Sequence, residues 1–176
     1  LALIEKLLKH WKRRNTIRRA KENIQAHYDL GNSFYQAWLD KSLTYSSALF
    51  KKSNGDKSTD LYEAQQNKIS RVIDLLKNLQ PDASVCEIGL GWGSVAEKII
   101  NATSWRYEGL TLSEKQFSFV TEKFKTVKNN NRLNFEIKDY RLMNNKYDAI
   151  ISIEMFEAVG QKYWDVFFEK VSTCLK

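Results

Sequence analysis

The sequence predicts an α/β fold in which helices cover both faces of a parallel sheet. Short apolar runs fit for buried strands occur at 84–89, 105–110, 133–138 and 147–153. Helical patterns separate them at 93–103 and 113–128, and a last one runs over 163–174. The first strand leads through three glycines at alternate positions into a helix, in the stretch V-C-E-I-G-L-G-W-G. Strands that alternate with helices require crossover connections and a parallel sheet.

We divide the chain into an N-terminal cap, residues 1–58, and a sheet-bearing part, residues 59–176. Residues 1–26 are predicted to be helical, with an apolar stripe that includes Trp11. Its first 21 residues carry a net charge of +7, equal to that of the whole chain, because Glu5 is the one acidic residue beside Lys6, Lys9, Lys12, Arg13, Arg14, Arg18, Arg19 and Lys21. Cations beside apolar side chains are typical of segments that bind an anionic membrane surface. Nucleic-acid binding and a solvated helix packed on the domain are the alternatives.

The segment between the cap and the first strand supplies a helix and a candidate pocket wall. Thr59 or Asp60 can cap a helix that runs to about Leu79, and Pro81 ends it. Before it, the stretch T-Y-S-S-A-L-F interleaves hydroxyls with aromatic rings. Such a stretch suits a pocket that is apolar yet able to form hydrogen bonds.

The carboxyl ends of the predicted strands should form one crevice. Ligands of parallel α/β sheets bind there, near the point where the strand order reverses. We expect residues 89–93, 110–113, 139–141 and 153–157 to converge on it. The glycine turn lets the backbone approach a ligand closely, and the helix that follows offers free N–H groups.

The residues at these ends favour S-adenosylmethionine as the cofactor. The spacing G-x-G-x-G is not the G-x-G-x-x-G of dinucleotide folds, and no Walker lysine follows it. No acidic residue ends the second strand to hold ribose hydroxyls, because Glu108 comes one step early. Asp139 and Tyr140 suit an adenine, with a carboxylate for its amine and a ring alongside. Glu87 has two interpretations. It is a buried charge with its own hydrogen-bond partners, or it is a carboxylate that fixes the glycine turn or binds a cofactor amine.

Six motifs in order carry a family resemblance. They are H-Y-D-L-G-N-S-F-Y, T-Y-S-S-A-L-F, E-I-G-L-G-W-G, G-L-T-L-S-E-K-Q, K-D-Y-R and S-I-E-M-F-E-A-V-G. On these motifs, from about Asn23 to Lys176, the chain resembles the cyclopropane-fatty-acyl-phospholipid synthase family, which includes the mycolic acid cyclopropane synthases. The resemblance implies a Rossmann-like S-adenosylmethionine-dependent methyltransferase sheet with an N-terminal helical cap. It also implies methyl or methylene transfer to the double bond of an unsaturated phospholipid acyl chain, through a carbocation.

The resemblance also implies roles for individual residues. The predicted cofactor-binding residues are Tyr45, Ser46, Glu87, Gly89, Gly91, Thr111, Leu112, Gln116, Asp139 and Tyr140. Glu157 matches the glutamate that holds a bicarbonate ion, the base of the reaction in that family, and the Ser47 N–H can donate near that ion. An aromatic face such as Tyr28, Phe34 or Tyr35 would stabilise the cation. We therefore predict Glu157, Ser47 and Tyr28 as catalytic residues.

The chain departs from the family pattern in two motifs, T-Y-S-S-A-L for T-Y-S-C-A-Y and E-M-F-E-A for G-M-F-E-H. Ser47 stands where T-Y-S-C has a cysteine, and Glu154 and Ala158 stand where G-M-F-E-H has glycine and histidine. If the turn is helical, Glu154 and Glu157 face the same pocket. On the other reading, both are loop carboxylates at a helix start, where the helix dipole favours them. With these departures, the product can be a cyclopropane ring, a methyl branch or a methylene group.

The composition and the lengths of the apolar runs limit where the protein is expected to be found and which other functions it could have. No apolar run reaches the length of a membrane-spanning helix, and nothing resembles a signal peptide. Cys86 and Cys174 lack metal-ligand spacing, so we expect structural thiols in a reducing compartment and no metal. We expect a cytoplasmic protein, peripherally associated with the inner face of the membrane, with no nucleic-acid partner and with a homo-oligomer left open. The rivals are a methyltransferase of a small amine or nucleic acid, and an inactive fragment truncated after the fourth strand and its helix.

Overall fold

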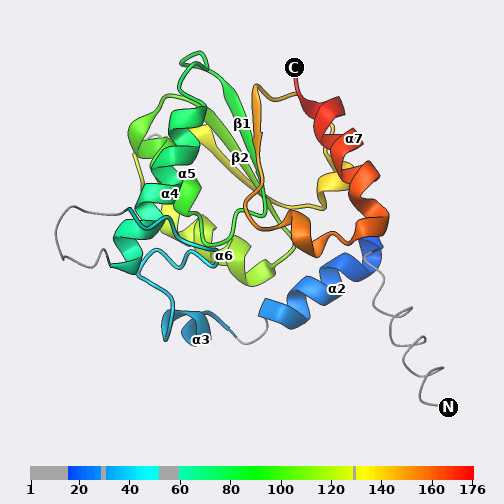
Figure 1. Ribbon diagram of the computed structural model, residues 1–176, viewed down its shortest axis with the longest axis horizontal. Coiled ribbons are helices and arrows are strands. Elements are labelled where there is room, and N and C mark those ends of the chain that lie inside the picture. Colours follow the sequence, from blue (N-terminus) through cyan, green and yellow to red (C-terminus); the bar gives the residue numbers. More distant parts are fainter. Residues whose placement is uncertain (1–15, 29–30, 52–59, 129) are drawn as a thin grey trace.

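The computed structural model describes residues 16–28, 31–51, 60–128 and 130–176, and its centre is a four-stranded sheet (Figure 1). The order across the sheet is β3-β2-β1-β4, and each neighbouring pair is parallel. The strands are β1 (Ser84–Ile88), β2 (Arg106–Thr111), β3 (Leu133–Ile137) and β4 (Ala149–Ile151). The predicted α/β fold with a parallel sheet is confirmed.

Strand β1 lies between β2 and β4, and the direction of winding reverses beside it. Glu87 is opposite Gly109 of β2 on one side and opposite Ile151 of β4 on the other. The chain proceeds from β1 outward through β2 to β3, then crosses back to β4 on the far side of β1. A reversal of this kind opens a crevice at the carboxyl ends of the two strands that flank it. The fold therefore places a ligand site between the ends of β1 and β4.

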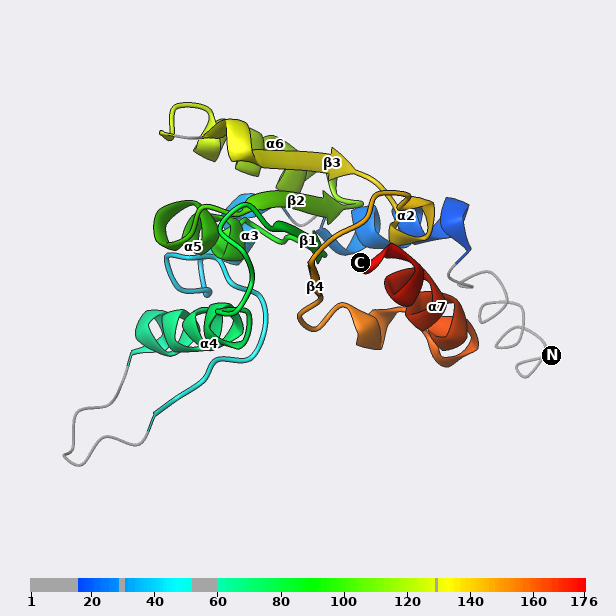
Figure 2. The same ribbon diagram turned by 90° about the horizontal axis from the view of Figure 1, so that it is seen from above.

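Side chains of β1 alternate between two hydrophobic cores, because successive residues of a strand point to opposite faces. Val85 belongs to the core under α4 (Leu61–Leu75), α5 (Ser94–Ala102) and α6 (Glu114–Phe124). Cys86 and Ile88 belong to the core under α7 (Trp164–Cys174), which also contains Cys174. Figure 2 shows α4 and α5 on one side of the strands and α7 on the other. Both cysteines are free and buried, in agreement with structural thiols.

The predicted helix caps are present, and two helices end earlier than expected. The Asp60 side chain accepts the Glu63 N–H at 2.7 Å and caps α4, and Ser113 caps α6 by accepting the Gln116 N–H at 3.2 Å. We expected α4 to reach Leu79, but it ends at Leu75, because the Leu76 N–H bonds to the Ile73 carbonyl in a tighter turn. Helix α6 ends at Phe124 instead of 128.

Strand β4 is shorter than the predicted 147–153. Before it, the Asp148 carboxylate accepts the Ser84 N–H at 2.8 Å, and Tyr147 forms only an isolated bridge with Leu175. After Ile151 the backbone turns away from the sheet, and Glu154 adopts a positive φ of 49°. The end of this strand is therefore a turn that faces the crevice rather than more sheet.

The N-terminal part contributes α2 (Ile17–Tyr28), α3 (Asn32–Gln36) and an extended segment. Tyr35, Leu43 and Trp92 form a small core that joins it to the glycine turn. Trp11 and the basic residues before Thr16 lie outside the described residues, as does the predicted boundary at 58/59, which stays a prediction. Within the described part of the chain, none of the helices has the length and apolar character needed to cross a membrane.

Candidate functional site

A cavity of about 490 Å³ lies at the carboxyl ends of the strands. Every residue predicted to bind the cofactor lines it: Tyr45, Ser46, Glu87, Gly89, Gly91, Thr111, Leu112, Gln116, Asp139 and Tyr140. Residues from each of the four stretches expected to converge are among the lining residues, so the predicted crevice is present. Helix α2 adds Ala20 and Ile24, which brings the N-terminal part against the same cavity.

The glycine turn needs its glycines for two different reasons. All three have a positive φ, 90° at Gly89, 56° at Gly91 and 82° at Gly93. A Cβ on Gly93 would come within 2.9 Å of the Phe124 ring, so this glycine lets α6 pack against the turn. A Cβ on Gly91 would meet nothing within 4 Å and would extend into open space. Gly91 therefore leaves room for a ligand to approach the backbone.

Glu87 is a buried carboxyl group on the cavity wall. Its side chain accepts a short hydrogen bond from the Tyr107 hydroxyl, and the Tyr107 ring lies where a Cβ on Gly109 would stand. Burial raises the pKa of Glu87 to about 7, although the Tyr107 hydrogen bond and the charge of Lys68 act to lower it. This carboxyl group can therefore change its charge near neutral pH.

Two polar side chains order the end of β2. The Thr111 hydroxyl donates to Gln116 Oε1 at 2.8 Å and accepts the Ser113 N–H at 3.0 Å. All three residues are buried. The bonds fix the turn between β2 and α6. Gln116 lines the cavity, and its amide nitrogen is a donor group.

The Asp139 carboxylate is held by its neighbour. Arg141 Nε donates to Asp139 Oδ1 at 2.8 Å, and Arg141 Nη2 donates to Asp139 Oδ2 at 2.6 Å. We expected this carboxylate to accept an adenine amine, and it has lone pairs left to do so beside the ion pair. The Tyr140 hydroxyl is buried without a hydrogen-bond partner among the described residues, while its ring packs on Phe167.

Helix α4 holds the T-Y-S-S segment with two polar side chains. Gln65 Nε2 donates to the Ser46 carbonyl at 2.7 Å. Lys68 Nζ donates to the Ser47 carbonyl at 2.8 Å and forms a short bond to the Ser46 hydroxyl. Burial lowers the pKa of Lys68, although nearby carboxylates, Glu154 first among them, act in the opposite direction. This lysine brings a positive charge to the cavity wall.

Ser47 and Glu154 are in direct contact across 107 positions of sequence. Glu154 Oε1 accepts the Ser47 N–H at 2.8 Å and the Ser47 hydroxyl at 2.5 Å. The Ser47 hydrogen bond is the largest cause of a lowered pKa at Glu154, followed by the smaller opposing effect of burial. Glu154 lines the cavity and is exposed to solvent.

Two of the predicted catalytic residues, Glu157 and Ser47, are not among the described residues that line the cavity. Glu157 is exposed on a short 3-10 turn, Phe156–Ala158; its neighbours Met155 and Ala158 line the cavity, but it does not. Ser47 is exposed and touches the cavity through Glu154. Tyr28 ends α2, and its side chain lies outside the described residues. Their catalytic roles stay predictions.

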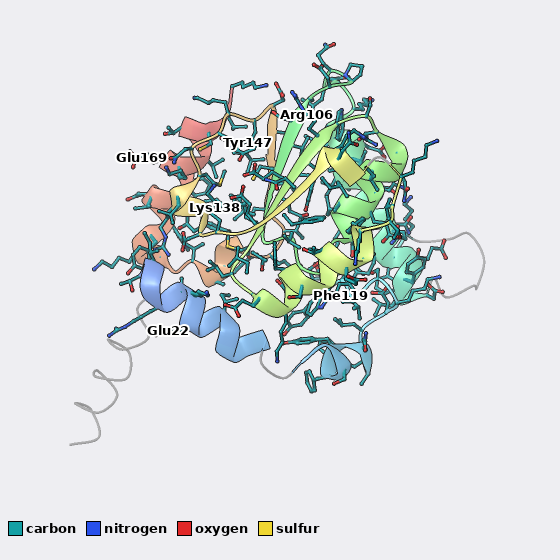
Figure 3. All side chains as sticks on the ribbon, turned by 180° about the vertical axis from the view of Figure 1, so that it is seen from behind. Glu22, Arg106, Phe119, Lys138, Tyr147 and Glu169 are labelled. Atoms are coloured by element: carbon teal, nitrogen blue, oxygen red, sulfur yellow. The ribbon has the colours of Figure 1, made fainter. Side chains whose placement is uncertain are left out.

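Aromatic residues of the N-terminal part form one group with Trp92 around Tyr35. Its ring centroid lies 4.9 Å from that of Trp92 and 5.5 Å from that of Tyr45. Phe34 is largely exposed, whereas Tyr45 and Trp92 line the cavity. Phe119 of α6 packs against this group and the first core (Figure 3). The rings with access to a ligand are therefore Tyr45 and Trp92 rather than Phe34 and Tyr35.

A model of the family described as "Mycolic acid cyclopropane synthetase" matches residues 15–176. The chain belongs to this family. Cyclopropane mycolic acid synthase 2 of Mycobacterium bovis is 34% identical over 155 residues, which are 88% of this chain and 50% of the relative. The cyclopropane-fatty-acyl-phospholipid synthase of Escherichia coli is 33% identical over 85% of this chain and 37% of its own length. The Mycobacterium tuberculosis tuberculostearic acid methyltransferase UfaA1 is 34% identical over 85% of this chain and 35% of its own length.

Solved structures give the same result. The mycolic acid cyclopropane synthase CmaA1, in complex with SAH and CTAB, matches with a TM-score of 0.80 at 31% identity. The match covers 89% of this chain and 53% of that one. The cyclopropane synthase MmaA2 from Mycobacterium tuberculosis also matches with a TM-score of 0.80, at 32% identity. The chain thus spans about half the length of these family members, or less.

Two of the departures from the family pattern meet each other in the structure. Ser47 replaces the cysteine, Glu154 replaces the glycine, and the two are hydrogen-bonded. The resemblance implied a bicarbonate held near the Ser47 N–H and by Glu157. That N–H already donates to a carboxylate, and two unit charges about 4 Å apart repel by about 4 kcal/mol at an effective dielectric constant of about 20. The described residues therefore do not fit a bicarbonate bound in that way.

Sequence reasoning missed the place of Lys68 on the cavity wall and the ion pair of Arg141 with Asp139. Lys68 had a signal, because Gln65 and Lys68 lie one turn apart in α4, next to the buried Ala64 and Ile69. Polar side chains at a buried helix face indicate a partner there. The ion pair of Arg141 with Asp139 had a weaker signal, since both belong to the motif K-D-Y-R.

Proposed function

We propose that this protein transfers a methyl or methylene group from S-adenosylmethionine to the double bond of an unsaturated phospholipid acyl chain. The observation that carries the proposal is the convergence of all predicted cofactor-binding residues on one cavity at the strand ends. Family membership supports it, because the names of the relatives refer to cyclopropane synthesis or to fatty acid methylation. The activity is proposed for the whole protein, because this chain spans only about half the length of the family members it matches, or less.

Groups on the cavity wall fit the parts of S-adenosylmethionine. The open space at Gly91 and the start of α5 suit its compact amino-acid part, and the Glu87 carboxylate can accept from its ammonium group. Asp139 and the unpartnered Tyr140 hydroxyl suit the polar edge of adenine. When bound, the cofactor supplies an electrophilic methyl group on a sulfonium.

The rest of the cavity suits an acyl chain. An alkene is a poor nucleophile, so it must be aligned with the methyl donor in a site from which water is excluded. Apolar side chains provide that lining: Ile24, Leu43, Ile69, Ile153 and Met155. The faces of Tyr45 and Trp92 can stabilise a carbocation on the chain through their quadrupoles.

We also propose that the N-terminal segment brings the cavity to an anionic membrane surface. The support is its sequence, with a basic cluster beside Trp11. Helix α2 continues this segment and reaches the cavity wall at Ala20 and Ile24. A phospholipid bound at the surface would then enter the cavity beside α2.

The test uses the full-length protein and vesicles of an anionic phospholipid with an oleoyl chain. Isothermal titration calorimetry measures S-adenosylmethionine binding, and mass spectrometry measures the lipids after reaction. The proposal predicts binding and a lipid gain equal to one CH₂, or to CH₄ if the product is also reduced. Proton NMR then separates a cyclopropane from a methylene group. Cofactor binding without any change in the lipid would favour a methyltransferase of another substrate.

A further inference from the structure

Glu154 occupies a backbone conformation that glutamate rarely adopts. Its φ of 49° lies in the left-handed region, where a side chain costs energy and glycine does not. The family pattern has a glycine at this position. This chain therefore has a carboxylate side chain where the backbone conformation favours a residue without a side chain. Strain retained at a cavity wall points to a function of the residue that causes it.

The contacts of Glu154 hold its carboxylate in the cavity. Both Ser47 donors, the N–H and the hydroxyl, point at Glu154 Oε1. The next residue, Met155, lies against the glycine turn, since a Cβ on Gly89 would meet its side chain at 3.1 Å. Glu154 thus links the segment that carries Tyr45 and Ser46 to the turn predicted to hold the cofactor. Glu157, by contrast, is not among the described residues that line the cavity.

We propose that the carboxylate of Glu154 is the base of the reaction and takes the place of a bound bicarbonate. The proposal rests on the proposed function, methyl transfer to an acyl double bond. After transfer, the acyl chain carries a carbocation and must lose a proton from the methyl-derived carbon. A carboxylate oxygen of Glu154 takes this proton. The electron pair of the broken C–H bond then forms the third bond of a cyclopropane ring. If a 1,2-hydride shift first moves the cation to the carbon that bears the methyl group, the same electron pair forms the double bond of a methylene group.

The electrostatics of the site suit this role. Hydrogen bonds from Ser47 lower the pKa of Glu154, so the carboxylate is ionised and ready to accept. A weak base is sufficient, because loss of the proton neutralises the carbocation and is strongly favourable. The side chain is exposed to solvent, so the neutral acid can return its proton to water after each turnover. Lys68 supplies a nearby positive charge that holds the anion.

Three variants separate this role from a structural one. Glu154→Gln keeps the size and an oxygen that can accept from Ser47, but removes the charge. Glu154→Gly removes the carboxylate and the strain, and frees the Ser47 N–H for an outside anion. Glu169→Gln is the matched control, because Glu169 is an exposed glutamate on the outer side of α7, away from the cavity (Figure 3).

The experiment measures turnover of full-length protein on oleoyl phospholipid vesicles, in carbon-dioxide-free buffer and with added bicarbonate. We expect wild-type turnover to be independent of bicarbonate and Glu154→Gln to be slower by about a hundredfold or more, with unchanged S-adenosylmethionine affinity. Glu154→Gly should be slow without bicarbonate and faster with it. Wild-type turnover that requires bicarbonate, or full turnover of Glu154→Gln, would overturn the proposal.

A binding measurement separates this inference from the proposed function. The amide NMR signal of Ser47 is followed during a bicarbonate titration of wild type and Glu154→Gly. We expect a saturable shift in the glycine variant only, and a shift of the same affinity in wild type would overturn the inference. A wild-type protein that modifies no lipid contradicts the proposed function instead, and the titration still decides whether Glu154 displaces the ion.

Discussion

The two ends of the cavity follow the family pattern to different degrees. At the cofactor end, which comprises residues 89–93, 111–116 and 139–141, the predicted residues line the cavity and the glycine turn has the expected conformation. At the reaction end, which comprises residues 44–47, Lys68 and 153–155, a serine and a strained glutamate replace two family residues and bond to each other. The cofactor end therefore keeps the family pattern, and the departures gather at the reaction end, where we propose that Glu154 removes the proton.

The largest expected effect concerns the cofactor end. Gly93→Val should lower the free energy of unfolding by about 4 kcal/mol, because it combines a positive φ with a clash against Phe124. Gly91→Ala, which meets no protein atom, should cost about 1 kcal/mol of stability yet weaken S-adenosylmethionine binding. Chemical denaturation and calorimetry on both variants check this. Equal stability losses would show that the two glycines have the same role.

Next in size is the pH dependence that Glu87 creates. Its folded-state pKa of about 7 exceeds the unfolded value of 4.5, so the folded protein binds the extra proton between these values. The stability contribution is present below the unfolded pKa and is lost as pH rises through about 7, by about 3 kcal/mol in all. Glu87→Gln should remove this loss. Unfolding curves at about pH 5 and about pH 8 test it, and parallel pH profiles for both proteins would contradict it.

Much of the cofactor end could be predicted because it follows from chain geometry. Parallel strands bring their carboxyl ends to one edge, so residues after each strand meet there whatever their identity. Caps at Asp60 and Ser113 are local hydrogen bonds and are visible in sequence. The Ser47–Glu154 bond joins residues 107 positions apart and depends on a turn that no periodicity indicates. The orientation of Lys68 likewise depends on where the T-Y-S-S segment crosses α4.

A smaller effect tests how the reaction end is held. Lys68→Met removes the bonds to Ser46 and Ser47, so Tyr45 and Ser46 lose their position on the wall. We expect a loss of turnover of about tenfold or more, because the variant removes two positioning hydrogen bonds from a charged group. Arg71→Met, an exposed change on the same helix, should have no effect. Steady-state kinetics with phospholipid vesicles compare the two variants. Equal activities would show that Lys68 does not position the reaction end.

The smallest expected effect is at the cap of α4. Asp60→Ala should lower the free energy of unfolding by about 1 kcal/mol, since the Glu63 N–H loses its acceptor. Cofactor affinity should not change, because the cap lies outside the cavity lining. Asp82→Ala, an exposed aspartate in a turn, serves as the control. Thermal unfolding with and without S-adenosylmethionine measures the stability and the cofactor affinity of each variant. A changed affinity in Asp60→Ala would contradict the prediction, because it would show that the cap affects the cofactor end.

One measurement tests the central claim, transfer of a methyl group followed by loss of one of its protons. Full-length protein is incubated with oleoyl phospholipid vesicles and S-adenosylmethionine that carries a trideuterated methyl group, and the lipid is analysed by mass spectrometry. We predict a modified acyl chain that retains two of the three deuterium atoms. A chain that retains all three, or a lipid without label, would contradict the account.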